Sequence, residues 1–148
     1  CRKIEPHVST TRERFEVLMR CKELGIPTLV WMTPILPFIN DTRENIEGLL
    51  DYCLLAGVQG VLVFDVGVTL REGDREYFYQ ALDRDFPSIR QKYISTYGNA
   101  YDIPSPYAKE LMALIQNTCV ANGMLCSPKE CFTYLHEFPE RYVQQTLF

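Results

Sequence analysis

The chain has 148 residues, of which 47% are hydrophobic, 12% aromatic and 23% charged. This composition is typical of one soluble globular domain with a packed core, and it excludes an intrinsically disordered chain. The net charge of −4 argues against a protein that holds DNA or RNA by itself. No apolar run is long enough for a membrane span and no signal-peptide pattern opens the chain, so we expect no membrane partner. The scattered cysteines do not suggest a disulfide framework, so we expect the reducing cytoplasm as its location.

The first half alternates helical and strand patterns. Residues 10–24 predict a helix with an apolar stripe at Val17, Leu18, Cys21 and Leu24. An uninterrupted β-prone run follows at 28–32, which is typical of a strand buried on both faces in a parallel sheet.

A second helix and strand follow in the same order. Asn40-Asp41-Thr42 supplies a helix start, and Gly57 ends that helix. Residues 60–65 predict a second apolar strand, and the two strands begin about thirty residues apart, which fits one βαβ unit. The fold class is therefore α/β with parallel strands at 28–32 and 60–65.

Beyond position 65 the patterns predict a loop over 66–73 and then helices only. We divide the chain into an α/β part at 1–86, a helical part at 87–138 and a tail without regular pattern at 139–148. The expected helices begin at Asp74, Pro87, Ser105 (as the capping residue) and Lys129.

Two parallel strands are too few for a stable sheet. Their outer edges carry unpaired backbone groups, which invite pairing with another chain. Since the sequence also opens at Cys1 without an initiator Met, we interpret it as a fragment of a longer polypeptide and expect the isolated fragment to self-associate.

The six cysteines form no C-x-x-C pair and show no standard zinc or iron–sulfur spacing. Four of them fall on apolar helix faces, where a free cysteine behaves as a small hydrophobic residue. We expect no metal site within this chain. The four are Cys21, Cys53, Cys119 and Cys131.

Ligands of parallel α/β folds bind at loops that follow the carboxyl ends of the strands. The first such loop, 33–41, is long and contains two prolines. Thr33, Asn40 and Asp41 could donate or accept hydrogen bonds in a pocket there; alternatively, Asp41 and Thr42 only cap the next helix.

The second loop, 66–73, follows Asp65 at the strand tip and contains Arg71, which could hold a carboxylate or phosphate. Alternatively, Arg71 forms a surface ion pair with Glu72 or Asp74. The sequence contains no G-x-S-x-G motif and no glycine-rich phosphate loop, so these residues alone assign no activity.

Four segments together resemble radical S-adenosylmethionine enzymes of the spore photoproduct lyase and DNA repair photolyase-like type. The resemblance covers roughly residues 4–75 and continues more weakly to Phe138. The segments are Glu5-Pro6, Leu24-Gly25-Ile26-Pro27, the series from Pro34 to Asp41, and Leu70-Arg71-Glu72-Gly73.

The resemblance implies a partial triose-phosphate-isomerase-like barrel in which the two strands are the last ones. It implies S-adenosylmethionine and a [4Fe–4S] cluster as cofactors of the full-length parent, with a DNA lesion as substrate. The family holds its cluster through a C-x-x-x-C-x-x-C motif that this sequence lacks, so we expect the fragment alone to be inactive. It also implies that the missing N-terminal part of the barrel is a partner of this chain.

Carried onto this sequence, the resemblance suggests Thr33, Asn40 and Asp65 as cofactor-binding residues. Asp41 and Arg71 are the corresponding candidates for substrate binding. The positions most worth testing are Thr33, Asn40, Asp65 and Arg71.

The tail 144–148 resembles the Q-x-x-L-F peptides that insert into a pocket of the bacterial sliding clamp, with Gln144, Leu147 and Phe148 as the contacts. The alternative to an enzyme fragment is therefore a non-catalytic α/β interaction module that recruits such a partner. A cysteine motif upstream of Cys1 in the parent gene would favour the enzyme.

Overall fold

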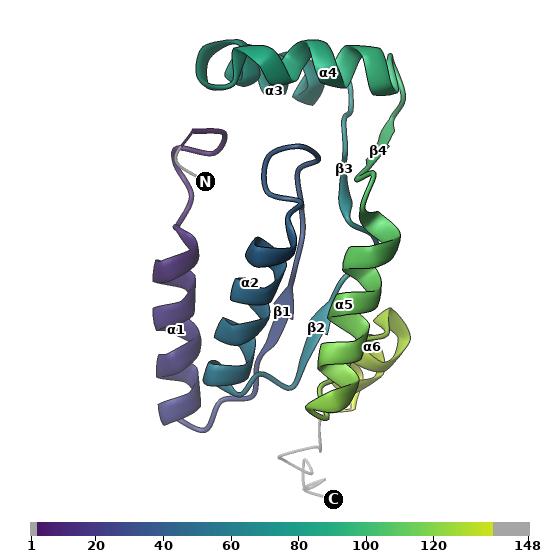
Figure 1. Cartoon of the computed structure of the whole chain (residues 1–148). Helices are drawn as coiled ribbons and strands as arrows, with labels where there is room; N and C mark the ends of the chain where they lie inside the picture. Colours follow the sequence, from purple (N-terminus) through teal and green to yellow (C-terminus); the bar gives the residue numbers. More distant parts are fainter. Residues whose placement is uncertain (1–2, 138–148) are drawn as a thin grey trace, which may run out of the picture.

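The computed structural model describes residues 3–137, and two parallel strands flanked by helices form its centre (Figure 1). Short antiparallel strands and further helices follow. In chain order the elements are α1 (Thr11–Glu23), β1 (Leu29–Trp31), α2 (Arg43–Ala56), β2 (Gly60–Leu62), β3 (Gly67–Thr69), α3 (Asp74–Asp85), α4 (Pro87–Tyr97), β4 (Asp102–Pro104), α5 (Ala108–Ala121) and α6 (Pro128–His136).

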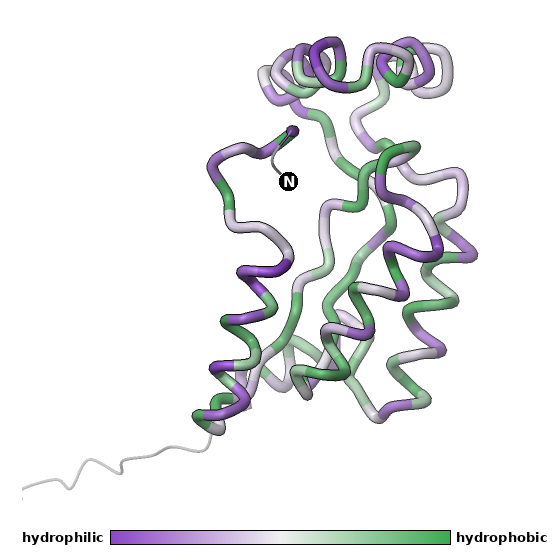
Figure 2. Tube along the Cα trace, turned by 60° about the vertical axis from the view of Figure 1, so that its left-hand side comes forward, coloured by the Kyte–Doolittle hydropathy of each residue, from purple (hydrophilic) through white to green (hydrophobic). Residues whose placement is uncertain are grey.

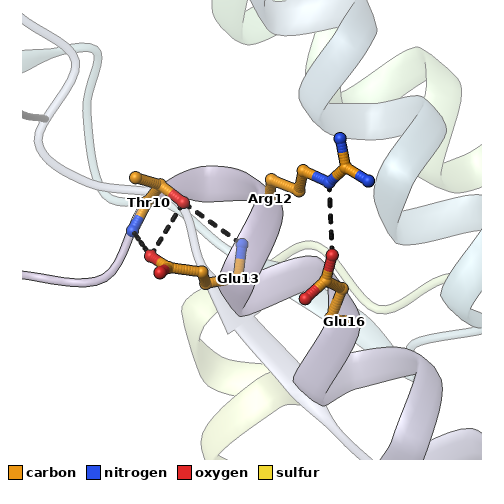
Figure 3. A network of polar contacts seen from close by, with 4 residues as sticks. All are labelled: Thr10, Arg12, Glu13 and Glu16. Carbon is orange, nitrogen blue, oxygen red and sulfur yellow. Dashed lines mark hydrogen bonds and ion pairs between the residues drawn. The ribbon is translucent and has the colours of Figure 1, made fainter.

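The α1 helix begins with a capping box (Figure 3). The backbone N–H of Glu13 donates to the Thr10 hydroxyl at 3.3 Å, and the Thr10 N–H donates to the Glu13 carboxylate at 2.6 Å. One turn on, Arg12 pairs with Glu16 at 3.2 Å on the exposed face. These local bonds satisfy backbone groups that a helix terminus otherwise leaves unpaired.

The α1 helix buries none of its residues, although hydrophilic and hydrophobic residues alternate along it (Figure 2). Of the predicted stripe, Val17 and Leu24 remain 63% and 58% exposed. The helix is held mainly against α2, where Phe15 stacks on Tyr52 with ring centroids 4.5 Å apart. One apolar face of α1 therefore has no partner among residues 3–137.

The prediction of two adjacent parallel strands is confirmed. β1 pairs with β2 in the register Leu29↔Gly60, Val30↔Val61 and Trp31↔Leu62. The paired segments are shorter than the predicted 28–32 and 60–65. The far edge of β2 is covered by Leu125, which accepts from the Val61 N–H at 2.8 Å.

The connection between these strands is α2, whose ends are capped as predicted. The Asn45 N–H donates to the Thr42 hydroxyl at 3.2 Å, and Gly57 ends the helix in the left-handed region with φ 66°. The helix and α5 cover one face of the sheet. They build the larger core cluster, whose innermost members are Ile46, Leu50, Val61, Ile115 and Cys119.

The prediction that 66–73 is an irregular loop is wrong, because it contains β3, which pairs antiparallel with β4 in the register Val68↔Ile103. Strands of three residues are too short to show a periodic pattern. Arg75 stabilises this pair from α3: its guanidinium donates to the carbonyl of Ala100 at 2.6 Å and to that of Leu70 at 3.1 Å.

The α3 and α4 helices lie across the end of the molecule towards which β1 runs (Figure 1). Phe78 and Leu82 of α3 and Tyr93 of α4 form a second core cluster, which also receives Phe38 from the loop after β1. Residues on both sides of position 86 thus share one core.

Two predicted helix starts are shifted. Gly73, not Asp74, precedes α3, and its N–H donates to the Glu76 carboxylate at 2.6 Å. Tyr107, not Ser105, is the capping residue of α5. Ser105 forms a turn before that helix, in which its hydroxyl accepts from the Tyr107 N–H at 3.0 Å.

Within residues 3–137 the strands form two separate two-stranded sheets and no closed barrel. No helix in this part of the chain has the length and apolar character needed to cross a bilayer.

Candidate functional site

A cavity of about 880 Å³ lies where β1 ends. Its walls are α1 and the segment before it, β1 and the loop that follows β1, one side of α2, β3 and the start of α3. Cavities of this size with mostly apolar walls and a few polar groups are typical of small-molecule sites. Polar or charged side chains in the walls include Arg14, Thr33, Asn40, Asn45, Thr69 and Asp74.

Two of the predicted site residues line this cavity, Thr33 and Asn40. The Asn40 side-chain oxygen accepts from the Leu36 N–H at 2.6 Å, and its backbone carbonyl accepts from the Asn45 amide at 2.8 Å. Asn40 therefore shapes the loop as well as lining the cavity.

The loop after β1 is held by its contacts with Tyr93 of α4. The fully buried Tyr93 donates its hydroxyl to the Pro37 carbonyl at 2.7 Å, and burial raises the pKa of this hydroxyl, so it stays protonated as a donor. Phe38, with φ 61°, packs edge-on against Tyr93 at 5.7 Å. These contacts give the cavity a fixed wall on this side.

Asp41 lies outside the cavity walls. It is only 4% exposed, and the Ser105 hydroxyl donates to its carboxylate at 2.5 Å. Because the helix cap comes from Thr42, capping does not account for Asp41. Its observed contact instead joins the start of α2 to the segment that precedes α5.

Asp65 and Arg71 also lie outside the cavity walls. Asp65 accepts from the N–H of the following residue, Val66, at 2.7 Å. Arg71 is exposed and donates to the Tyr101 hydroxyl at 3.3 Å. The predicted alternative, an ion pair with Glu72 or Asp74, is not formed. The contact with Tyr101 raises the pKa of Arg71 and lowers that of Tyr101.

Sequence reasoning missed most of the cavity walls, because they come from elements far apart in the chain. Phe15 and Tyr52 belong to two helices, and Lys3 and Ile4 come from the segment before α1. That segment is held near α3, where Arg84 donates to the Lys3 carbonyl at 3.0 Å. Trp31 was visible as the aromatic end of a strand, but only its 56% exposure marks it as unusual.

The buried cysteines are protonated small residues, as expected. Burial raises the pKa of Cys53 to about 11 and that of Cys119 to about 12. Between residues 3 and 137 the structure brings together no group of three or more His, Cys, Asp or Glu side chains that could hold a metal ion. This part of the chain therefore offers no ligand set for an iron–sulfur cluster.

The clamp-binding hypothesis for Gln144, Leu147 and Phe148 concerns residues that lie outside the described part of the chain.

Comparison with known proteins gives distant relatives. The chain is 29% identical over 110 residues to the uncharacterized protein Rv2578c of Mycobacterium tuberculosis and, with the same figures, to the uncharacterized protein Mb2609c of Mycobacterium bovis. The matched stretch is 74% of this chain but 32% of each relative, so the chain spans about a third of their length. No family model matches the chain, and no solved structure does.

Proposed function

We propose that this chain is the C-terminal portion of a radical S-adenosylmethionine enzyme of the spore photoproduct lyase and DNA repair photolyase-like type. The observation that carries the proposal is the parallel β1–α2–β2 unit with a cavity of about 880 Å³ at the end of β1. Active sites of (βα) barrels lie at this end of the strands. The motif resemblance of residues 4–75 selects the family.

The described residues do not fit an iron–sulfur cluster, since they gather no three thiolates. In this proposal the cluster ligands come from the part of the parent that this chain does not contain. The greater length of the mycobacterial relatives is compatible with such a parent.

The chain's own contribution is one wall of the cofactor and substrate cavity. Thr33 and Asn40 supply polar groups to it, and Phe15, Tyr52 and Trp31 supply apolar surface. Asp41, Asp65 and Arg71 do not line the cavity, so in this proposal they do not contact the cofactor or the substrate directly. A DNA lesion remains the substrate class that the resemblance suggests.

The test uses the full-length parent, reconstituted with iron and sulfide without oxygen. We expect iron–sulfur absorbance and cleavage of S-adenosylmethionine to 5′-deoxyadenosine. Thr33→Val should weaken binding of S-adenosylmethionine by roughly tenfold, the value of one lost hydrogen bond. The matched control is Thr118→Val on α5, a threonine that is not among the residues lining the cavity and whose loss should leave binding unchanged.

A full-length parent that takes up no cluster and does not bind S-adenosylmethionine would refute this function. The alternative, a non-catalytic interaction module, would then be favoured. Its own test is the affinity of a peptide of residues 139–148 for the sliding clamp, which Leu147→Ala and Phe148→Ala should abolish.

A further inference from the structure

Asp41 and Ser105 form a polar contact inside the molecule. Asp41 is the only charged side chain that is buried within residues 3–137, and Ser105 is buried with it. The Ser105 hydroxyl donates to the Asp41 carboxylate, and no Lys or Arg of this part of the chain forms an ion pair with that carboxylate. Burial of a carboxylate without a cation costs free energy of folding, so stability alone does not account for Asp41.

The contact joins the loops that follow the two parallel strands. Asp41 belongs to the loop after β1. Ser105 is tied to the loop after β2, because its N–H donates to the Val66 carbonyl at 2.8 Å. The Ser105 hydroxyl also accepts from the Tyr107 N–H at 3.0 Å, which fixes its direction. A fixed hydroxyl therefore holds the end of the loop after β1.

The α4 helix anchors the segments on both sides of this contact. Tyr93 donates to the Pro37 carbonyl in the loop after β1 at 2.7 Å. Tyr97 donates to the Pro104 carbonyl, beside Ser105, at 2.6 Å. Burial raises the pKa of Tyr97, and the nearby charge of Asp41 raises it further. The surroundings of Asp41 are thus set by α4 as well as by its own loop.

Asn40, the residue before Asp41, lines the cavity. Its side-chain oxygen accepts from the Leu36 N–H at 2.6 Å, so this end of the amide is turned to its own loop. Its side-chain nitrogen donates to no group within residues 3–137. That nitrogen is therefore free to donate to an acceptor oxygen of a ligand in the cavity.

We propose that Asp41 and Ser105 are positioning residues for the cavity: their hydrogen bond holds the loop so that Asn40 donates its side-chain N–H to an acceptor oxygen of the bound ligand. The inference deepens the proposed function and rests on it for the ligand, S-adenosylmethionine, whose carboxylate and hydroxyl groups supply such oxygens. The placement of Asn40 by the buried contact needs no ligand.

Binding of S-adenosylmethionine to the full-length parent separates positioning from simple stabilisation. Asn40→Ala should weaken binding by roughly tenfold, since it removes one hydrogen bond. Ser105→Ala should weaken it by a similar factor. The double variant should bind about as weakly as either single variant, because both changes remove the same contact with the ligand. A purely structural role predicts independent losses that add to roughly a hundredfold, and that result would overturn the proposal.

Two further comparisons distinguish the hydrogen bond from a general loss of folding. Asp41→Asn keeps an acceptor oxygen for the Ser105 hydroxyl, so it should restore most of the binding that Asp41→Ala loses. Ser95→Ala is the matched control on α4, because Ser95 is exposed and its hydroxyl donates to the Lys92 carbonyl of the same helix. Equal losses in Asp41→Asn and Asp41→Ala would refute positioning through the hydrogen bond.

Hydrogen exchange in the 148-residue chain tests the placement of Asn40 without a cofactor. The Leu36 amide, which donates to Asn40, should be protected, and Ser105→Ala should speed its exchange by at least about tenfold. The Met32 amide, which donates to Leu62 of β2, is the internal control and should not change. Unchanged exchange at Leu36 in this variant would overturn the proposal whatever the parent binds.

The two readouts fail independently. A parent that binds no S-adenosylmethionine, together with faster exchange at Leu36 in Ser105→Ala, would end the proposed function and preserve the placement of Asn40 by the buried contact. Binding of S-adenosylmethionine that Ser105→Ala leaves unchanged would do the reverse.

Discussion

At the scale of single residues, burial decides the chemistry of the polar side chains. Asp41 and Asn40 are neighbours in the sequence, yet Asp41 is buried against Ser105 and Asn40 lines the cavity. The sequence pattern cannot predict that these two adjacent residues have different surroundings, because Ser105, which contacts Asp41, lies 64 positions away. The same holds for the cysteines: helical spacing predicted their apolar environment, but its depth follows from packing.

Buried thiols predict a loss of stability at alkaline pH. The pKa values of Cys53 and Cys119 are raised from 9.0 to about 11 and about 12 in the folded chain. Between pH 8 and 10 the unfolded chain therefore releases protons that the folded chain retains, so the free energy of unfolding should fall as pH rises. The slope is at most about 1.4 kcal/mol per pH unit for each thiol.

Urea unfolding at pH 8, 9 and 10 measures this effect. The double variant Cys53→Ala/Cys119→Ala should start from a lower stability and show a shallower decline. A free energy of unfolding that does not change over this range would contradict the burial of both thiols.

At the scale of elements, helices and the two parallel strands were predictable because their information is local. Capping residues and apolar spacing placed α1 and α2 within a residue or two. β3 and β4 were not predictable, since each has three residues and is defined only by pairing across more than thirty positions. The close contact between Gly60 and Leu125 could not be predicted from the sequence either, because the two residues lie far apart in the chain.

Two glycine substitutions separate close packing from helix propensity. At Gly60 an added Cβ would lie 2.6 Å from the Leu125 carbonyl oxygen, so Gly60→Ala should destabilise the chain by about 2–3 kcal/mol. Gly48→Ala is the matched control in α2, where an added Cβ meets nothing within 4 Å, and it should stabilise by roughly 0.5–1 kcal/mol. Denaturant midpoints of both variants give the comparison; equal midpoints would show that Leu125 does not pack on β2.

At the scale of the whole molecule, the chain has a filled side and an open side. α2 and α5 cover one face of the β1–β2 sheet with a continuous core. On the other side, Trp31 and Phe64 are each 56% exposed, with ring centroids 5.7 Å apart. Exposed aromatic pairs beside an unpaired strand edge are typical of a surface that another polypeptide covers.

The isolated chain should therefore self-associate through the outer edge of β1, which has no partner strand within residues 3–137, and through the exposed aromatic side chains beside it. Light scattering over a range of concentrations should show an average mass that rises with concentration. Val17→Asp, on the α1 side of the cavity that β1 also lines, should lower this association, whereas Val120→Asp on α5, which is 77% exposed and does not line the cavity, should not. A well-folded chain that stays monomeric at every concentration would contradict this prediction.

The sequence by itself determined the α/β class, the two parallel strands, the ends of α1 and α2 and the apolar character of the buried cysteines, because each leaves a local pattern in the chain. Only the tertiary structure decided which candidate site residues share a cavity. Thr33 and Asn40 line it, whereas Asp41, Asp65 and Arg71 lie outside its walls. The reason is that cavity walls are assembled from side chains far apart in the chain, whose meeting depends on how the helices and strands pack.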